Sequence, residues 1–254
     1  HLNPAHEQAA RATIKREYPR DYLGSVPVFL ASNISARDGE TERVNAACIN
    51  AYIHARLVRL LYKAGEDLRR QQYRGSLFIS HNDGAVARVA KTRALSTYNS
   101  GPAGGLMGAR LLGELYGAAT LISADMGGTS FDLGYVRGGE ASYALTADIE
   151  GLRVNLPMLA IRAIGAGGGS IAQVVAGELR VGPRSAGALP GPACFGLGGT
   201  EATVTDANVV LGIIDPGCFL GGGMQLDAAK AQAAIATQIA APLGISVDEA
   251  ALRV

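Results

Sequence analysis

Several features that define common protein classes are absent from this sequence. Its three cysteines lie far apart and show no C-x-x-C spacing, which excludes a disulfide framework and favours reduced thiols in the cytosol. The four histidines form no metal-binding spacing such as H-E-x-x-H, so this chain alone is not expected to build a zinc site. No apolar run is long enough to span a membrane, and the N-terminus does not resemble a signal peptide. We therefore expect a cytoplasmic protein without membrane contacts.

The sequence also lacks a large excess of positive or negative charge. The formal net charge is +1, and the chain has no lysine-rich run and no interleaving of basic and aromatic residues. A nucleic-acid partner is therefore not expected. Glycine, by contrast, is abundant at 34 residues and clusters in loops, as expected where the backbone approaches a ligand. The length of 254 residues suffices for one large domain or two small ones. Because the chain does not begin with Met and residues 247–254 have the pattern of an interrupted helix, we expect a segment of a longer polypeptide.

The most informative stretch is residues 118–136. Two β-rich runs flank a small polar tip, which predicts a hairpin. The residues of the tip are Gly127, Gly128, Thr129 and Ser130. The glycines allow close approach of the backbone to an anion, and the hydroxyls add donors for phosphate oxygens. Asp125 and Asp132 flank the tip with oxygen ligands of the kind that Mg²⁺ uses beside a nucleotide. The alternative is a tight hairpin with capping carboxylates, but acids on both sides favour phosphate binding.

A second glycine-rich stretch follows a strand-like segment at 158–164 and precedes residues 171–176, for which we predict a helix. Its glycines are Gly165, Gly167, Gly168 and Gly169. Strand, glycine-rich turn and helix is the context in which such a loop binds a nucleotide; elsewhere a glycine run is only a linker. No acidic residue ends a following strand at the distance that the Rossmann fingerprint requires. The stretch therefore predicts a nucleotide contact but not an NAD site.

The remaining pattern alternates between helices and strands. Helices are expected at 4–18, at 41–72 with Thr41 as the cap, at 102–116 and from Asp227 to about 241; strands are expected at 26–31, 76–80 and 140–149. The apolar face of the second helix is predicted to include Val44, Ala47, Cys48, Ala51, Leu57, Leu60 and Leu61. The Pro- and Gly-rich residues 182–199 suggest a functional loop or lid.

Three further sites have competing structural and functional interpretations. Ser80, His81 and Asp83 suggest a catalytic triad, but neighbouring residues on a strand point to opposite faces, so a polar strand end at a ligand cleft is favoured. Residues 100–105 precede a helix and allow either close packing or anion binding at its N-terminus. Asp206 lies in a short helix that begins after Thr203 and is most simply explained as an acid of the first turn.

Five motifs in one order resemble the hydantoinase A/5-oxoprolinase family. They lie at 100–105, 125–132, 164–172, 181–194 and 198–208, and together they cover most of the chain from about Ser76 onward. The resemblance implies an α/β protein with part of the actin-like ATPase fold, related to ribonuclease H, with a mixed sheet and flanking helices. It divides the chain into 1–75, the end of an N-terminal region with a long connecting helix, and 76–254, the nucleotide-binding domain.

The resemblance also implies chemistry. Such enzymes use ATP and Mg²⁺ to phosphorylate a carbonyl oxygen of a small cyclic amide or ketone, and they work with a hydantoinase B-type subunit or domain. Asp125 and Asp132 then become catalytic candidates, and Asp125 and Asp206 metal candidates. The tip residues 127–130 would hold phosphates, and the glycines of 165–169 would contact the nucleotide. The leading expectation is a cyclic-amide hydrolase; the alternatives are a ketone carboxylase subunit and a non-catalytic actin-like interaction module. A sugar kinase is disfavoured, because no other motif supports it.

The sequence departs from the family pattern in three places. Phe131 stands where the family commonly has Thr, which removes one hydroxyl, and residues 81–84 read His-Asn-Asp-Gly rather than Ser-Asn-Gly-Gly. Family members also carry an earlier Asp-x-Gly-Gly-Thr hairpin, whereas this chain has a single such hairpin. We therefore expect half of the nucleotide cleft here and no ATPase activity of the isolated segment.

Overall fold

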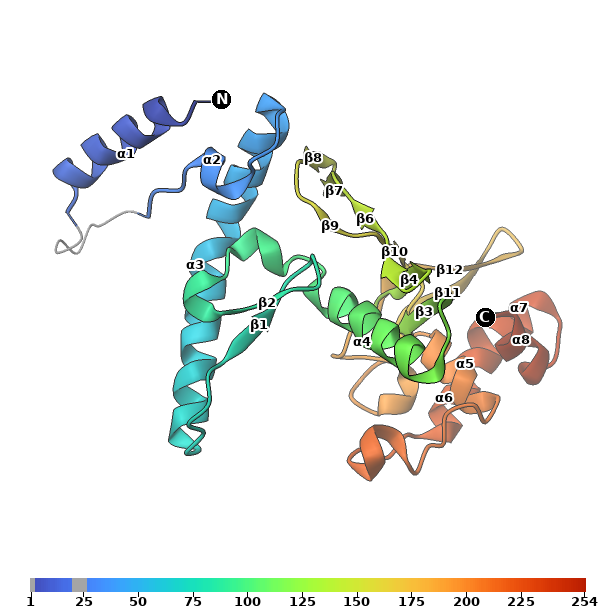
Figure 1. Cartoon of the computed structure of the whole chain (residues 1–254). Helices are drawn as coiled ribbons and strands as arrows, with labels where there is room; N and C mark the ends of the chain where they lie inside the picture. The colour runs from blue at the N-terminus through green and yellow to red at the C-terminus, as the bar shows by residue number, and fades with distance from the viewer. Residues whose placement is uncertain (1–2, 20–26) are drawn as a thin grey trace. The chain divides into compact units, whose positions relative to one another are not determined.

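The computed structural model describes residues 3–19 and 27–254, and it divides the chain into two compact units. The first contains residues 1–123 and 134–161, and the second contains 124–133 and 162–254. The chain passes between the units inside three strands, β3 (Leu121–Met126), β4 (Phe131–Arg137) and β10 (Ile161–Ile164) (Figure 1). The boundary expected at 75/76 therefore falls within the first unit.

The first unit combines four helices with short strands in the residues described. The helices are α1 (Ala5–Glu17), α2 (Ala31–Ile34), α3 (Glu40–Arg70) and α4 (Ser100–Tyr116), with 3-10 turns η1 (Val89–Lys91) and η2 (Ala94–Thr97). The strands wholly within it are β1 (Phe78–Ser80), β2 (Val86–Arg88), β5 (Glu140–Ala141), β6 (Tyr143–Ala144), β7 (Ala147–Ile149), β8 (Leu152–Val154) and β9 (Met158–Leu159). The helices expected at 4–18, 41–72 and 102–116 are confirmed within two residues at their ends.

Helix α3 differs from its predicted form in its cap and in its buried face. Gly39 is the N-cap, and Thr41 lies inside the helix. The buried residues are Arg43, Ala46 and Asn50, whereas Val44 and Leu60 of the predicted apolar face are 52% and 62% exposed. The helix buries polar side chains here because they satisfy neighbouring groups: the Asn50 amide oxygen accepts a hydrogen bond from the Leu95 N–H at 3.1 Å.

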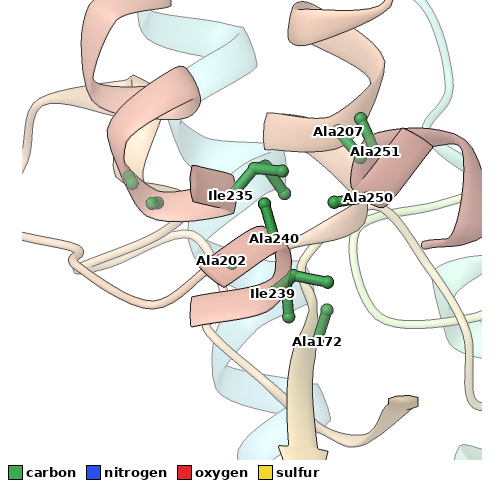
Figure 2. Packing of buried hydrophobic residues seen from close by; sticks show 10 residues of the cluster. Ala172, Ala202, Ala207, Ile235, Ile239, Ala240, Ala250 and Ala251 are labelled. Carbon is green, nitrogen blue, oxygen red and sulfur yellow. The ribbon is translucent and has the colours of Figure 1, made fainter. Parts of the chain in front are cut away.

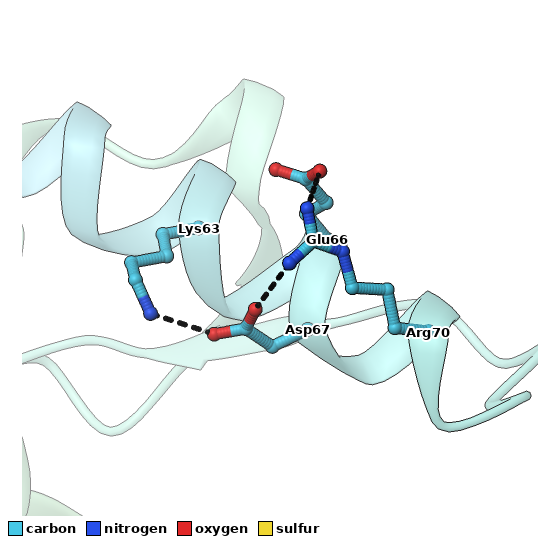
Figure 3. A network of polar contacts seen from close by, with 4 residues as sticks. All are labelled: Lys63, Glu66, Asp67 and Arg70. Atoms are coloured by element: carbon cyan, nitrogen blue, oxygen red, sulfur yellow. Dashed lines mark hydrogen bonds and ion pairs between the residues drawn. The ribbon is translucent and has the colours of Figure 1, made fainter.

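The last turns of α3 carry a solvated network of ion pairs (Figure 3). Lys63 donates to Asp67 at 2.9 Å, and Arg70 donates to Glu66 at 2.6 Å, each across one helical turn. These side chains are largely exposed. Pairs of this kind stabilise a helix by only about 0.3–0.5 kcal/mol each, so they support the helix without fixing its packing.

Two strand predictions in this unit are wrong. Residues 27–30 have no regular structure and Ala31 begins α2, while Val26 of the expected strand lies outside the described residues. The strand expected at 140–149 is broken into β5, β6 and β7, which pair with β4, β9 and β8. Each short strand pairs with a different strand, and the periodicity of the sequence does not predict strand pairing.

The sheet that holds the central hairpin has the strand order β10-β4-β3, with β5 also paired to β4. The hairpin predicted at residues 118–136 is thereby confirmed as β3 and β4, separated by the four-residue tip. The strand-like segment at 158–164 is present but is interrupted at Ala160 between β9 and β10.

The second unit adds one long hairpin and a group of helices. Its strands β11 (Ser170–Val175) and β12 (Glu178–Ser185) pair in antiparallel fashion. The helical elements are η3 (Ala193–Phe195), α5 (Val204–Val210), η4 (Phe219–Gly222), α6 (Ala228–Ile235), the π-helical turn η5 (Ala236–Ala240), α7 (Ala241–Leu243) and α8 (Val247–Arg253). The helix expected from Asp227 is confirmed, with the Asp227 carboxylate accepting the Lys230 N–H at 3.0 Å.

The core of the second unit consists mainly of alanine around two isoleucines (Figure 2). Ile235 and Ile239 are fully buried, and Ala172 of β11 belongs to the same cluster. Small side chains let the helices approach one another closely, because packing at interior density leaves no room for larger ones. Among the described residues, no helix has both the length and the apolar character needed to cross a membrane.

The helix predicted at 171–176 is wrong, because this segment is strand β11. Ala176 and Gly177 follow it with φ angles of 51° and 81°, the two positive values that a tight hairpin turn requires. The β-branched Ile171, Val174 and Val175 suit a strand. The glycine-rich stretch 165–169 therefore lies between two strands, not between a strand and a helix.

Candidate functional site

The tip of the β3–β4 hairpin is exposed and lies in the second unit. The Gly127 N–H donates to the Ser130 carbonyl at 2.8 Å and closes the turn. Gly127, Gly128 and Thr129 are exposed. Within the part of the chain that the structure describes, the N–H groups of Gly128 and Thr129 donate to no other residue. Two backbone donors are thus free to bind a ligand.

The two carboxylates beside the tip lie on one face of the hairpin. Gly127 lies opposite Ser130, and a Cβ added at Gly134 would stand 2.6 Å from the Ser123 hydroxyl, which places Ser123 opposite Gly134. An uninterrupted ladder between these pairs puts Asp125 opposite Asp132. Directly opposed residues of an antiparallel pair have Cβ atoms about 4.5–5.5 Å apart, and like charges there repel. A cation between the carboxylates would remove that cost.

The surroundings of the two carboxylates differ. Asp132 is half-buried and accepts a hydrogen bond from the Ser130 hydroxyl at 3.0 Å. Asp125 is exposed, and no described residue donates to its carboxylate. In the described part of the chain, no three side chains of His, Cys, Asp or Glu gather as a metal site. A metal ion here would therefore need further oxygens from phosphate or water.

The glycine-rich loop is joined to the hairpin tip by backbone hydrogen bonds. The Gly168 N–H donates to the Gly127 carbonyl at 2.9 Å, and the Gly169 N–H donates to the Gly128 carbonyl at 2.6 Å. A Cβ on Gly167 would stand 2.5 Å from the Ser130 nitrogen, and one on Gly169 would stand 2.7 Å from the Gly128 oxygen. Both contacts are too short to exist, so glycine is required here by the hairpin's own backbone.

This packing changes the explanation of the glycines. None of Gly165, Gly167, Gly168 and Gly169 has a positive φ, so turn geometry does not demand them. The sequence did not predict these hydrogen bonds between the loop and the hairpin. Its expected nucleotide contact stays a prediction, since the nearest neighbours of Gly167 and Gly169 are atoms of the protein.

Thr205 and Asp206, at the start of α5, hold the other side of this loop. The Thr205 N–H and hydroxyl both donate to the Gly168 carbonyl, each at 2.8 Å. The Asp206 carboxylate is fully buried. It accepts from the N–H groups of Ala193, Cys194 and Thr203 and from the Thr203 hydroxyl at 2.7–3.2 Å. Thr203 and Asp206 form a capping box, as the first-turn interpretation predicts.

These contacts give Asp206 a structural role. Four donors occupy its carboxylate oxygens, and none of its surface reaches solvent. The geometry therefore does not support Asp206 as a metal ligand. Asp125 and Asp132 remain the candidate ligands for Mg²⁺. Burial raises the pKa of the adjacent Cys194 thiol well above its usual range, and the Asp206 charge raises it further. Cys194 is therefore a protonated, structural thiol.

Part of the Pro- and Gly-rich stretch 182–199, which was expected to be a functional loop or lid, is held in place by the fold. Its first residues belong to β12, and residues 191–194 are buried. The Asp206 carboxylate fixes this part through the N–H groups of Ala193 and Cys194. The more exposed residues 196–200 border a cavity of about 440 Å³ beside α6.

Two further candidates belong to the first unit. Ser80, His81 and Asp83 have separate partners: Ser100, Thr92 and the Ala85 N–H, respectively. They form no triad. At the start of α4, a Cβ at Gly101 would meet nothing within 4 Å, and one at Gly104 would make only an ordinary contact at 3.5 Å. Close packing thus does not explain these two glycines.

Sequence reasoning missed Thr205 as a functional residue. The local run Thr203-Val204-Thr205-Asp206 indicates only a capped helix start. The bond from Thr205 to Gly168 spans 37 residues of sequence, so no local pattern predicts that partner.

Comparison with known proteins gives a consistent result. Residues 43–254 match the family described as hydantoinase/oxoprolinase. The acetophenone carboxylase gamma subunit of Aromatoleum aromaticum is 42% identical over 253 residues, which covers 98% of this chain and 35% of that protein. The caprolactamase subunit alpha of Pseudomonas jessenii is 39% identical and is matched over 98% of this chain and 36% of its own length.

Solved structures agree. A nucleotide-free structure of acetone carboxylase matches with a TM-score of 0.82 and 31% identity, over 98% of this chain and 35% of that chain. The ATP-dependent caprolactamase of Pseudomonas jessenii matches with a TM-score of 0.75 and 37% identity, over 99% and 36%. The chain is thus similar in fold to both and spans about a third of the length of these relatives.

Proposed function

Because the chain belongs to the hydantoinase/oxoprolinase family, we propose that it is the nucleotide-binding segment of an ATP-dependent enzyme that activates a carbonyl oxygen by phosphorylation. One observation carries the proposal. The hairpin tip presents unpaired N–H groups at Gly128 and Thr129, while the carbonyls of Gly127 and Gly128 are tied to the glycine loop behind it. Backbone donors held in place by a rigid support are what phosphate binding requires.

The residues of the tip then have distinct tasks. The N–H groups of Gly128 and Thr129 donate to phosphate oxygens, and the Thr129 hydroxyl adds a third donor. The Ser130 hydroxyl is engaged by Asp132 and orients that carboxylate. Asp125, exposed and free of protein donors, orients the water shell or the attacking oxygen. Fixed donors lower the barrier because they need no reorganisation when charge develops.

Mg²⁺ fits this tip. Two opposed carboxylates are hard oxygen donors, and their mutual repulsion falls when a divalent cation lies between them. Asp125 and Asp132 would hold the ion together with phosphate oxygens and water. When bound, it neutralises charge on the transferring phosphate.

The carbonyl substrate is either a small cyclic amide or a ketone. In the first case, the amide oxygen attacks the γ-phosphate, ADP leaves, and water then opens the activated ring and releases phosphate that carries the amide oxygen. A specific observation also supports a ketone carboxylase subunit: the gamma subunit of acetophenone carboxylase is 42% identical to this chain. Both chemistries need the same activation of a carbonyl oxygen by ATP.

The proposal includes a partner and a compartment. Relatives of this chain are named as gamma and alpha subunits, which supports assembly with other subunits. A hydantoinase B-type subunit or domain is the partner we propose. The free cysteines of the described residues, Cys48, Cys194 and Cys218, suit the reducing cytoplasm.

The test uses the full-length enzyme with its partner. ATP hydrolysis is measured with lactams labelled with ¹⁸O at the carbonyl, and with ketones plus labelled bicarbonate. Transfer of ¹⁸O to phosphate supports the hydrolase, and label in a carboxylated product supports the carboxylase. Nucleotide binding without turnover of either substrate class would leave a non-catalytic module and refute the proposed activity. The 254-residue segment alone is expected to show no ATPase, because the family resemblance implies a second phosphate hairpin that this chain does not contain.

A further inference from the structure

We propose that Thr205 is a positioning residue, which sets the hairpin tip for phosphate by fixing one peptide group of the glycine loop. The inference rests on the proposed function, since it assigns a role to a residue behind the tip. It concerns contacts that lie wholly within the second unit, between α5, the loop and residues 127–130.

The peptide group between Gly168 and Gly169 is the link. Its carbonyl accepts from the Thr205 N–H and hydroxyl, each at 2.8 Å. Its N–H, on Gly169, donates to the Gly128 carbonyl at 2.6 Å. One planar group therefore joins α5 to the centre of the tip, and it cannot rotate about one bond without straining the other.

The two ends of this link reinforce each other. A carbonyl that accepts two hydrogen bonds polarises its peptide group, which makes the attached N–H a stronger donor. The Gly128 carbonyl receives that bond, and the same planar peptide group carries the Thr129 N–H on its other side. The orientation of the free donor in the tip is thus coupled to the hydroxyl of Thr205.

The base of the link is rigid. Thr205 is itself buried, at 7% exposure, and Asp206 follows it directly. The Asp206 carboxylate binds three N–H groups and a hydroxyl, so the first turn of α5 is fixed to residues 193–194 and 203. Thr205 is therefore anchored in α5, and its two hydrogen bonds tie the loop to that helix.

The glycine at 168 matches this arrangement. A Cβ there would stand 2.8 Å from the Thr205 hydroxyl oxygen. The threonine occupies the space that a side chain on the loop would need, and the loop rests directly on it. Packing and hydrogen bonding thus act on the same peptide group.

The test compares Thr205→Val with Thr205→Ser in the full-length enzyme. Valine keeps the shape and removes the hydroxyl, while serine keeps the hydroxyl. We expect Thr205→Val to raise the KM for ATP about three- to tenfold, the effect of one lost hydrogen bond. The KM for the carbonyl substrate and the Tm should stay close to those of the parent. Thr205→Ser should restore the KM for ATP.

The matched control is Thr237→Val, because the Thr237 hydroxyl donates to carbonyls of the preceding helical turn, Ala233 at 2.8 Å and Ala234 at 3.4 Å. A second readout, amide hydrogen exchange of residues 126–131 without nucleotide, separates this inference from the proposed function. Faster exchange in Thr205→Val alone supports the link even if the enzyme binds no ATP. Unchanged exchange together with an unchanged KM for ATP in a folded Thr205→Val enzyme would overturn it.

Discussion

The start of α5 and the hairpin tip use similar residues for opposite purposes. At α5 the polar side chains of Thr203, Thr205 and Asp206 are satisfied, and Asp206 is fully buried and accepts four hydrogen bonds. At the tip, Asp125 is exposed and the N–H groups of Gly128 and Thr129 have no partner among the described residues. Satisfied polar groups stabilise a fold, whereas groups left open in a rigid frame are available to a ligand. The difference separates a structural acid from a candidate catalytic one.

The largest effect should come from breaking the satisfied region. Asp206→Ala leaves three N–H groups and a hydroxyl buried without a partner, which costs on the order of 4 kcal/mol. The Tm should fall sharply, and Cys194 should become reactive toward a thiol reagent, with the exposed Cys48 and Cys218 as internal references. Asp227→Ala is the matched control, because that helix-capping carboxylate accepts one backbone bond and its loss costs about 1 kcal/mol. Equal losses in the two variants would contradict the role assigned to Asp206.

Changing the open region should affect turnover rather than stability. Asp125→Asn in the full-length enzyme should lower ATP turnover by about two orders of magnitude, because charge or positioning is lost in the transition state. The Tm should not fall, since the carboxylate is exposed, has no donor in the described residues and is repelled by Asp132. Asp248→Asn, a surface carboxylate of α8, serves as the control and should leave turnover unaltered. A folded Asp125→Asn enzyme with near-normal ATPase would remove Asp125 from the mechanism.

The junction between the two regions can be tested through its glycines. Gly167→Ala places a Cβ 2.5 Å from the Ser130 nitrogen, so the backbone must move. We expect a loss of about 1–3 kcal/mol in stability, with lower ATP turnover. Gly165→Ala, whose Cβ would meet nothing within 4 Å, should change stability by less than about 0.5 kcal/mol. If the two variants have equal Tm values, the loop does not support the tip.

The smallest effect concerns a partly satisfied carboxylate in the first unit. The Ser32 hydroxyl and N–H donate to Glu7 at 2.6 and 3.0 Å and lower the pKa of that carboxyl below its usual 4.5. A depressed pKa means that the contribution to stability is complete above the unfolded value and is lost as pH falls through the folded one. Hydrogen exchange of α1 should therefore accelerate below about pH 4.5. Glu7→Gln should show fast exchange at neutral pH and little further change on acidification; a parent-like pH dependence in this variant would assign the effect to another group.

Local sequence determined the elements that depend on neighbouring residues. The β3–β4 hairpin was predictable because two β-rich runs flank a short glycine tip, and α5 was predictable because Thr203 and Asp206 form a capping box. The family was also readable, since five ordered motifs are more specific than any one of them, and the match over residues 43–254 confirms it.

Only the tertiary structure decided what depends on distant partners. The buried face of α3 follows from Arg43 and Asn50, whose partners come from other segments. The role of Asp206 depends on the N–H groups of residues 193–194, and that of Thr205 on Gly168, 37 residues away. A sequence records each residue's preference for its own backbone, but burial and hydrogen-bond satisfaction arise between segments that meet only when the chain folds.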